Sequence, residues 1–292
     1  MFSITKSNLD FYREAVSKYS PIIHFHSLED YFTCNLNDYT RYCDLFDKKN
    51  NSVLVEDFND LNDFENFIDE NLELQKDNEI YFLRIKDDKN YFGDVETSEI
   101  YATISNISEI DESFEINYWM FYPFNGYTSL LISPYFGEKY RCISNIFSLF
   151  HYLGTHQADW EHIKVKITNQ QIEKIYYSAH GSSEGRWYFP NEIEFTENHP
   201  HVYSAWHSHA SYPFAGTIHR TPSVKIFGHS IKIPFIGWLL KDYTNNKGIT
   251  LNTCEISILS DDQTWLKYGG RWGSQSSIIK KLMEDGPHGP LF

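Results

Sequence analysis

The sequence predicts a mainly β protein, an antiparallel β-sandwich with peripheral helices, especially near the N-terminus. Aromatic residues make up 17 % of its 292 residues, and aromatic and β-branched side chains are favoured in strands. Short runs of alternating apolar residues recur along the chain and are separated by Gly, Pro and Asn. About ten such runs in succession are typical of an antiparallel sandwich.

Each element is predicted from its own local pattern. A helix capped by Ser7 or Asn8 is expected up to Lys18, and a second helix is expected within 58–74, where apolar residues recur at helical spacing. Strands are expected at Ile80–Ile85, Ile100–Ser105, Phe114–Tyr122, Glu161–Thr168, Ile172–His180, Gly185–Phe189, Val202–His207 and Ile249–Leu259, with a further strand and turn within Pro21–Phe32. The apolar run 143–153 fits a helix or a strand equally well.

The chain is expected to form one domain over residues 1–292, since it has no repeat, no low-complexity tract and no clear linker. Within it, residues 1–110 form an acidic part with helical elaboration, and residues 111–292 form the core that carries the candidate site. Residues 1–110 hold 23 Asp and Glu against 10 Lys and Arg, whereas the whole chain has a net charge of −15. Such a surface repels phosphate, so a nucleic acid is not expected as a partner.

No apolar run reaches the roughly 18 residues that a membrane helix needs. Asp10, Arg13 and Glu14 interrupt the region where a signal peptide would have its apolar core. The sequence leaves the location undecided between the cytoplasm and the outside of the cell by a non-classical export route. The cysteines show no C-x-x-C pair, so zinc ribbons are not expected. Buried thiols are favoured, with a Cys34–Cys43 disulfide as the alternative.

The stretch from Gly154 to Ile167, GTHQADWEHIKVKI, is the most informative part of the chain. A short loop is expected to carry His156, Asp159 and Glu161 straight into an alternating strand. If the pleat begins early, the two carboxylates share the face of the isoleucines, at the edge of a buried layer, where carboxylates cluster mainly around a cation. This pattern predicts a divalent-cation site. The alternative is that the carboxylates pair with Lys or Arg and that His156 packs in a turn.

The motif resembles the G-H-R-H-D-W-E heptapeptide of the necrosis-inducing proteins of plant pathogens, with one residue inserted. The upstream segment NYWMFYPFN and the downstream segment YSAHG resemble segments of that family in the same order. The resemblance implies a β-sandwich that binds a divalent cation and then a sphingolipid headgroup. It implies that Asp159 and Glu161 hold the cation, that His156 orients the loop, and that Asn125 stands at the position of an acidic ligand.

A second resemblance covers nearly the whole chain. Six ordered blocks resemble the family of vacuolar protein sorting-associated protein 62: YSPIIHFHSLEDYF, INYWMFYPFNG, HQADWEHIKVKI, YSAHGSSEGRW, YSAWHSHASYPFAGT, and WG followed by GPHGP. This resemblance implies a fold and the position of a site, but no defined biochemistry.

Ten of the 13 histidines lie between His151 and His229, in the same region as the carboxylate motif. His207 and His209 would share a face if they lie in a strand, and with His156 and His180 they could form a pocket of imidazoles. Oxygen ligands favour calcium or magnesium, whereas an imidazole pocket would favour zinc.

Aromatic residues in loops are candidates for contacting a ligand, because their rings can stack on a sugar or enter a membrane interface. The candidates are Tyr127, Trp187 and Tyr212, with Arg220 to hold an anion.

The favoured function is cation-dependent binding of a glycan or a glycolipid headgroup, with membrane activity of a toxin-like kind. A metal-dependent hydrolase and an intracellular protein-sorting factor are the alternatives. None of the nucleophile motifs of hydrolases is present, which favours binding over catalysis.

Overall fold

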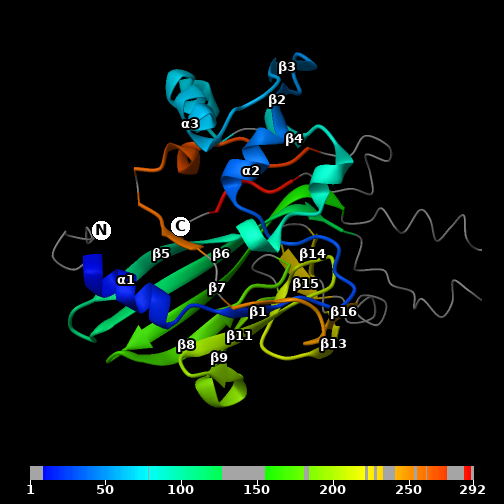
Figure 1. Cartoon of the computed structure of the whole chain (residues 1–292). Helices are drawn as coiled ribbons and strands as arrows, with labels where there is room; N and C mark the ends of the chain where they lie inside the picture. The colour runs from blue at the N-terminus through cyan, green and yellow to red at the C-terminus, as the bar shows by residue number, and fades with distance from the viewer. Residues whose placement is uncertain are drawn as a thin grey trace, which may run out of the picture.

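The computed structural model describes residues 9–77, 79–126, 155–180, 184–220, 223–226, 229–232, 241–252, 255–260, 262–274 and 286–290. Two β-sheets face each other and a smaller module of helices and strands covers part of the larger sheet (Figure 1). The predicted antiparallel β-sandwich with peripheral helices is confirmed.

The larger sheet has six strands. In pairing order they are β18 (Glu255–Ile258), β5 (Glu99–Ser108), β6 (Ser113–Asn125), β7 (His156–Thr168), β8 (Gln171–Tyr177) and β9 (Arg186–Tyr188). All neighbours are antiparallel except β18 and β5. The two long central strands, β6 and β7, pair over almost their whole length, from Ser113 opposite Thr168 to Asn125 opposite His156.

The facing sheet is built from segments that lie far apart in the sequence. Its strands are β10 (Phe195–Thr196), β11 (His199–Ser204), β1 (Ile22–His24) and β17 (Thr250–Leu251), and β12 (Ser211–Tyr212) pairs with β11. Strand β1 runs parallel to β11 and antiparallel to β17. An N-terminal strand is thus held between two segments from the second half of the chain.

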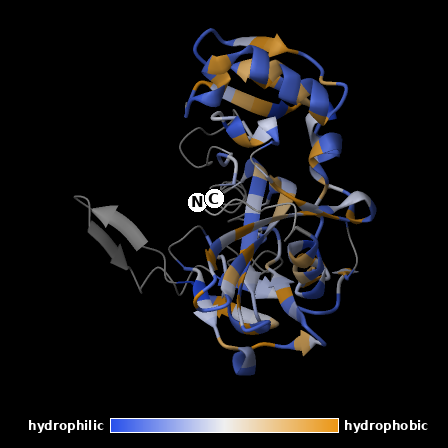
Figure 2. Cartoon of the chain, turned by 90° about the vertical axis from the view of Figure 1, so that its left-hand side faces the viewer, coloured by the Kyte–Doolittle hydropathy of each residue, from blue (hydrophilic) through white to orange (hydrophobic). Residues whose placement is uncertain are grey.

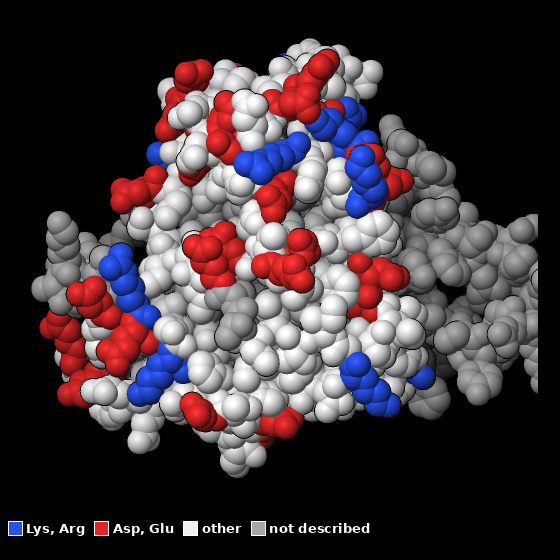
Figure 3. All heavy atoms as spheres, in the orientation of Figure 1, with Lys and Arg blue, Asp and Glu red and all other residues white. Residues whose placement is uncertain are grey.

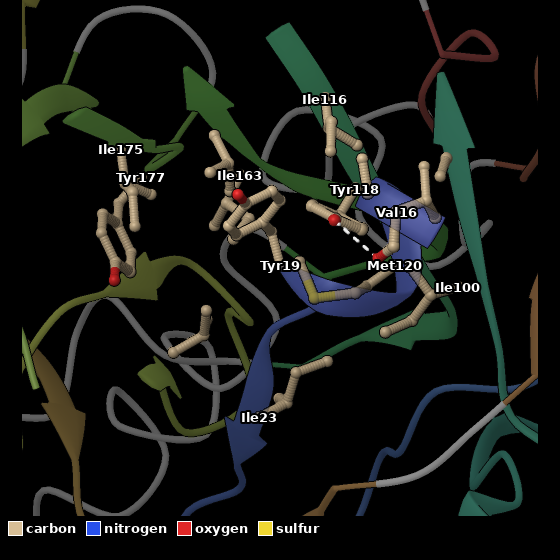
Figure 4. Packing of buried hydrophobic residues seen from close by; sticks show 14 of the residues in the cluster. Val16, Tyr19, Ile23, Ile100, Ile116, Tyr118, Met120, Ile163, Ile175 and Tyr177 are labelled. Carbon is tan, nitrogen blue, oxygen red and sulfur yellow. Dashed lines mark hydrogen bonds between the residues drawn. The ribbon is translucent and has the colours of Figure 1, made fainter. Parts of the chain in front are cut away.

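The first hydrophobic core fills the space between the two sheets (Figure 4). Alternation in β7 sends Ile163 and Val165 into this core, as the sequence predicts. Helix α1 (Leu9–Lys18) closes one end, and the buried hydroxyl of Tyr118 donates to the carbonyl of Val16 at 2.8 Å. This hydrogen bond satisfies a buried polar atom and fixes the helix against β6.

A second core lies on the other face of the six-stranded sheet, under the smaller module. The module contains α2 (Leu36–Arg41), β2 (Cys43–Asp47), β3 (Ser52–Val55), α3 (Leu61–Glu70) and β4 (Tyr81–Ile85). Trp160 of β7 and Trp272 lie at its centre with ring centroids 5.6 Å apart. The module occupies one end of the molecule and the facing sheets the other (Figure 2).

Short elements complete the described structure. The hairpin strands are β13 (Gly216–His219) with β16 (Lys241–Thr244), and β14 (Ser223–Ile226) with β15 (His229–Lys232). The 3₁₀ turns are η1 (Leu72–Gln75), η2 (Asp88–Tyr91), η3 (Val95–Thr97), η6 (Pro190–Glu192) and η8 (Thr264–Lys267). Over the described ranges, no helix has the length and hydrophobicity of a membrane span.

Several predicted strands differ from the structure in their bounds, and two of them differ because the chain changes sheet or direction. The run Ile249–Leu259 forms two short strands, β17 and β18, that belong to different sheets. The strand expected at Val202–His207 ends at Ser204, because the chain turns there toward β12. Strands β2 and β3 and helix α2 were not predicted. The apolar run 143–153 lies outside the described residues.

Cys34 and Cys43 are buried free thiols, which confirms the favoured prediction for this pair. The other two cysteines lie outside the described residues. On the face shown in Figure 3, acidic side chains lie over the smaller module at the top, across the middle, and at the lower left near α1. This distribution agrees with the acidity of residues 1–110 in the sequence.

Candidate functional site

Asp159 and Glu161 lie side by side in strand β7, not in a loop before it. The expected loop is wrong because β7 begins at His156, five residues earlier than predicted. Asp159 pairs with Tyr122, and Glu161 pairs with Met120, across the β6–β7 register. Both partners belong to the core between the sheets, so the two carboxylates share the face of Ile163, as the early-pleat prediction requires.

The backbone at Ala158 inverts the pleat just before Asp159. Ala158 has a φ of +59°, in the left-handed region that disfavours a residue with a Cβ. Regular alternation would place Gln157 and Asp159 on the same face. Instead, the amide of Gln157 hydrogen bonds to the backbone of Ile85 in the smaller module, while Asp159 turns into the sandwich.

A buried imidazole lies between two acidic side chains. The Nδ1 atom of His209 is 3.0 Å from a carboxylate oxygen of Asp159, and its Nε2 atom is 3.8 Å from one of Glu29. The ring stacks on that of Tyr122, with centroids 3.8 Å apart and an angle of 7° between the planes. Glu29 also accepts a 2.7 Å hydrogen bond from the backbone N–H of His207.

This arrangement favours the charged form of His209. Burial opposes its protonation, but the hydrogen bond to Asp159 and the negative charge of Glu29 outweigh burial and raise the pKa of His209 to about 9. Burial likewise pushes the pKa of Glu29 upward, but interactions with His209 and His207 lower it overall. An imidazolium therefore neutralises part of the acidic cluster in this structure.

Among the acidic side chains of the cluster, Glu161 is the one whose ionised form is most disfavoured. Its side chain is 6 % exposed and accepts a short hydrogen bond from the hydroxyl of Ser178. Burial, and then the negative charge of Asp159, raise the pKa of Glu161 well above its ordinary value. A positive charge placed nearby would therefore stabilise the ionised form of this carboxyl group.

A further buried carboxylate, that of Asp242 in β16, lies near Glu161. It is 2.5 Å from Nε2 of His180 and accepts hydrogen bonds from the hydroxyls of Tyr212 at 2.7 Å and Ser208 at 3.3 Å. Burial raises the pKa of Asp242, but the charge and hydrogen bond of His180 more than compensate, and the pKa is lowered. Its negative charge also contributes to the raised pKa of Glu161.

Residues 206–208 form a turn and His209 follows it, so the strand on which a shared face of His207 and His209 depends is not present. Both histidines have positive φ angles, +63° and +55°, as does His180 at +48°. Such angles are several-fold enriched in histidine compared with most side chains but still carry a backbone cost. The turn directs His209 toward Asp159, whereas His207 contacts Asp30, with Nε2 3.5 Å from a carboxylate oxygen.

Two of the predicted cation ligands lie at the start of the β6–β7 pair. His156 faces Asn125 in the register, and its Nδ1 atom hydrogen bonds to the carbonyl of Ala158 at 2.6 Å. The side-chain amide of Asn125 donates to the carbonyl of Gly126 at 3.3 Å. Among the residues that the structure describes, no three His, Cys, Asp or Glu side chains are already arranged around a common point as metal ligands. The cation site therefore stays a prediction.

Two of the predicted ligand-contacting residues, Tyr212 and Arg220, lie near Asp242, whereas Trp187 lies on another face of the molecule. Tyr212 belongs to the Asp242 cluster, and Arg220 forms an ion pair with Glu184 at 3.0 Å. Trp187 pairs with Tyr176 on the outer face of the six-stranded sheet, opposite to Asp159. Tyr127 lies outside the described residues.

Glu29 and Asp242 belong to the site but were not predicted as site residues from the sequence. Each enters the site from a segment far from residues 156–161, and neither has a spacing that links it to the motif. A signal was present for Glu29, since it lies in the block YSPIIHFHSLEDYF that carries the family resemblance.

The model of the family "Vacuolar protein sorting-associated protein 62" matches residues 5–281. The chain belongs to this family. A curated family relative, vacuolar protein sorting-associated protein 62 of Saccharomyces cerevisiae, is 21 % identical over 329 residues. The alignment covers 94 % of this chain and 64 % of the yeast protein, so the chain spans about two thirds of that relative's length.

Two solved structures are similar at low identity. A triply substituted mutant of NLPPya has a TM-score of 0.36 and 12 % identity, and covers 70 % of this chain and 68 % of its own. NLPPya in complex with mannosamine has a TM-score of 0.34 and 9 % identity, with coverages of 85 % and 73 %. These scores are too low to support any inference about the vacuolar protein sorting-associated protein 62 family member described here.

Proposed function

We propose that the protein binds a divalent cation, calcium or magnesium, at Asp159 and Glu161, and that this cation holds the hydroxyl groups of a glycan or glycolipid headgroup. The observation that carries the proposal is the burial of Glu161 beside a second buried carboxylate, that of Asp159, on one face of β7. One imidazolium, that of His209, leaves this group of acids short of positive charge. A divalent cation would supply the missing charge.

The donor set fits a hard cation. Carboxylate oxygens of Asp159, Glu161 and Glu29, with the hydroxyl of Ser178 beside Glu161, are the oxygen ligands that calcium and magnesium prefer. Asn125 would complete the set with an amide oxygen. If each carboxylate binds through one oxygen, these side chains supply five ligands, whereas calcium takes about six to eight oxygens, so hydroxyls of a sugar can fill the remaining positions.

His209 has a defined part in this proposal. In the cation-free protein it neutralises Asp159 and Glu29 from one side while its ring is held on Tyr122. Binding of a cation to the same carboxylates competes with this imidazolium. The bound cation would then replace the His209 imidazolium as the positive charge beside the carboxylates, which would remain neutralised.

Cation binding is tested by thermal unfolding and calorimetry with calcium, magnesium or a chelator. The expected result is a higher melting temperature with cation than with chelator, and loss of this difference in the double variant Asp159→Asn, Glu161→Gln. The matched control is Glu109→Gln, Asp111→Asn, which changes two exposed carboxylates at the same spacing in the turn between β5 and β6. A cation response retained in the Asp159, Glu161 variant contradicts the proposal.

Headgroup binding is tested with vesicles that carry glycosphingolipids and with matched vesicles that lack the sugar. Co-sedimentation is expected only when both the sugar and the cation are present, and it should be lost in the Asp159, Glu161 variant. Zinc-dependent cleavage of an ester or phosphoester without any headgroup binding would favour a hydrolase instead. Cation-independent binding to a protein partner would favour a sorting factor.

A further inference from the structure

A row of hydrogen-bonded side chains crosses the outer face of the five-stranded sheet, away from Asp159. It starts at Thr250 in β17, passes through His24 in β1 and His201 in β11, and ends at Thr196 in β10. The three contacts are 3.2 Å from the Thr250 hydroxyl to His24 Nδ1, 3.2 Å from His24 Nε2 to His201 Nδ1, and 2.9 Å from His201 Nε2 to the Thr196 hydroxyl.

The two threonine hydroxyls accept from the outer nitrogens when each histidine carries its proton there. In that state the inner nitrogens, Nε2 of His24 and Nδ1 of His201, face each other as two lone pairs 3.2 Å apart. Two lone pairs at this distance repel unless a proton or a metal ion lies between them. Metal-bound histidines in proteins usually donate the other ring N–H to an acceptor in the same way.

The distance fits a transition metal. In a tetrahedral site with metal–nitrogen bonds of about 2.0–2.1 Å, the two nitrogens are about 3.3 Å apart. A carboxylate oxygen of Glu194 lies 3.7 Å from the same Nδ1 atom of His201 and accepts a hydrogen bond from the hydroxyl of Tyr203 at 2.5 Å. The side chain of Glu194 is 62 % exposed, so a small movement can bring it to a metal between the rings.

The surroundings hold the two rings in place. The ring of His24 stacks on that of Tyr203 with centroids 4.7 Å apart, and the parallel pairing of β1 with β11 fixes His24 opposite Tyr203 and next to His201. His24 is partly exposed, and Thr250 and Thr196 are exposed, so an ion can reach the row from solvent. Rigid ligands with an exposed approach are what a metal site requires.

We infer that His24, His201 and Glu194 form a second metal site, specific for a transition metal such as zinc, on the outer face of the five-stranded sheet. It differs from the proposed calcium or magnesium site in position, in ligand chemistry and in the metals that it prefers. Imidazole nitrogens select zinc and cobalt over calcium and magnesium.

The test uses the full chain carrying Asp159→Asn and Glu161→Gln, so that the proposed cation site cannot contribute. Cobalt(II) is titrated into this parent protein after treatment with a chelator, and the visible absorption of the bound ion and the stoichiometry are recorded. The expected result is one cobalt ion per chain with nitrogen-ligand absorption, displaced by zinc and not by calcium.

Single substitutions in the parent assign the ligands. His24→Ala and His201→Ala are expected to abolish the signal, and Glu194→Gln to weaken binding by about tenfold or more. His219→Ala, which removes an exposed histidine from β13, is the matched control and should bind as the parent does. Urea unfolding checks that each variant is folded. If His201→Ala does not fold, His24→Ala and Glu194→Gln decide the question.

Absence of cobalt binding in the parent overturns the inference, as does unchanged binding in folded His24→Ala. Failure of this test leaves the calcium or magnesium proposal intact, because the parent lacks that site. Conversely, cobalt binding in the parent supports the second site even if wild-type protein shows no response to calcium.

Discussion

Gln157 and Asp159 stand two residues apart in β7, yet they hydrogen bond on opposite sides of the six-stranded sheet. Gln157 ties the strand to Ile85 of the smaller module, and Asp159 meets His209 inside the sandwich. The left-handed backbone of Ala158 makes this possible, because it reverses the pleat between them. One residue thus connects the packing of the module with the geometry of the candidate site.

Replacement of Ala158 tests this role. Ala158→Gly relieves a left-handed cost of roughly 1–2 kcal/mol but loses about 0.8 kcal/mol of methyl burial and some chain entropy, so its unfolding free energy should stay within about 1 kcal/mol of wild type. Ala158→Val should cost about 3 kcal/mol, since a branched side chain is strained there. The control Ala102→Gly, at a buried strand position, should cost about 1.5 kcal/mol. Equal losses in the two glycine variants, measured by urea unfolding, would contradict the argument.

Gln157→Leu should destabilise the protein by about 1–3 kcal/mol, because it leaves buried backbone groups of Ile85 without the side-chain amide. Chemical denaturation measures the loss. Gln171→Leu, at an exposed position that begins β8, is the control and should change stability by less than about 0.5 kcal/mol. A loss in Gln157→Leu no larger than in the control would show that the contact contributes little.

His209 should make the protein less stable at alkaline pH when a chelator is present. Burial lowers its pKa, but Asp159 and Glu29 raise it overall, to about 9 against 6.5 in the unfolded chain. Stabilisation by this imidazolium is therefore complete below pH 6.5 and is lost as the pH rises through about 9, on the order of 3 kcal/mol in all. The variant His209→Gln should flatten the stability profile in this window. An identical slope in wild type and variant would refute the assignment.

His162 should make the protein less stable at acidic pH, whereas His209 acts at alkaline pH. Burial, and then the charge of Lys164, lower its pKa to about 4, so its contribution is present above pH 6.5 and lost as the pH falls toward 4. The ring is partly exposed, so the loss is on the order of 2 kcal/mol. His162→Phe keeps an aromatic ring beside Trp119, 4.3 Å away in the wild type, and removes the titration. Stability measured between pH 4 and 7 should then fall less steeply than in wild type.

The alternation of Ile163 and Val165 predicts which way Asp159 and Glu161 point only if the pleat begins early, and the structure meets that condition. No local signal predicts the left-handed angle at Ala158, since alanine rarely adopts it and glycine or asparagine would mark it. The strand β7 therefore begins earlier than the alternation suggests.

The histidine partner of Asp159 could not be identified from spacing either. His156, which is close in sequence, bonds to a backbone carbonyl, whereas His209, 50 residues away, reaches the carboxylate through a turn. Strands β2 and β3 were predictable in principle, since Asp47, Asn50 and Asn51 at the connection between them are turn-forming residues and Asn51 has a φ of +51°.

In the part of the chain that the structure describes, both neighbours of strand β1 come from late in the sequence: Ile22 pairs with His201 and Ile23 with Leu251. Closing such long loops slows folding, because their entropy is lost before the contacts that compensate for it are formed. During synthesis, β1 and the Glu29 segment that follows it emerge before β11 and β17 and cannot join this sheet until those two strands have left the ribosome. A nascent chain stopped before Leu251 would lack one side of β1. Glu29 and His209 therefore come together only late in the maturation of the protein.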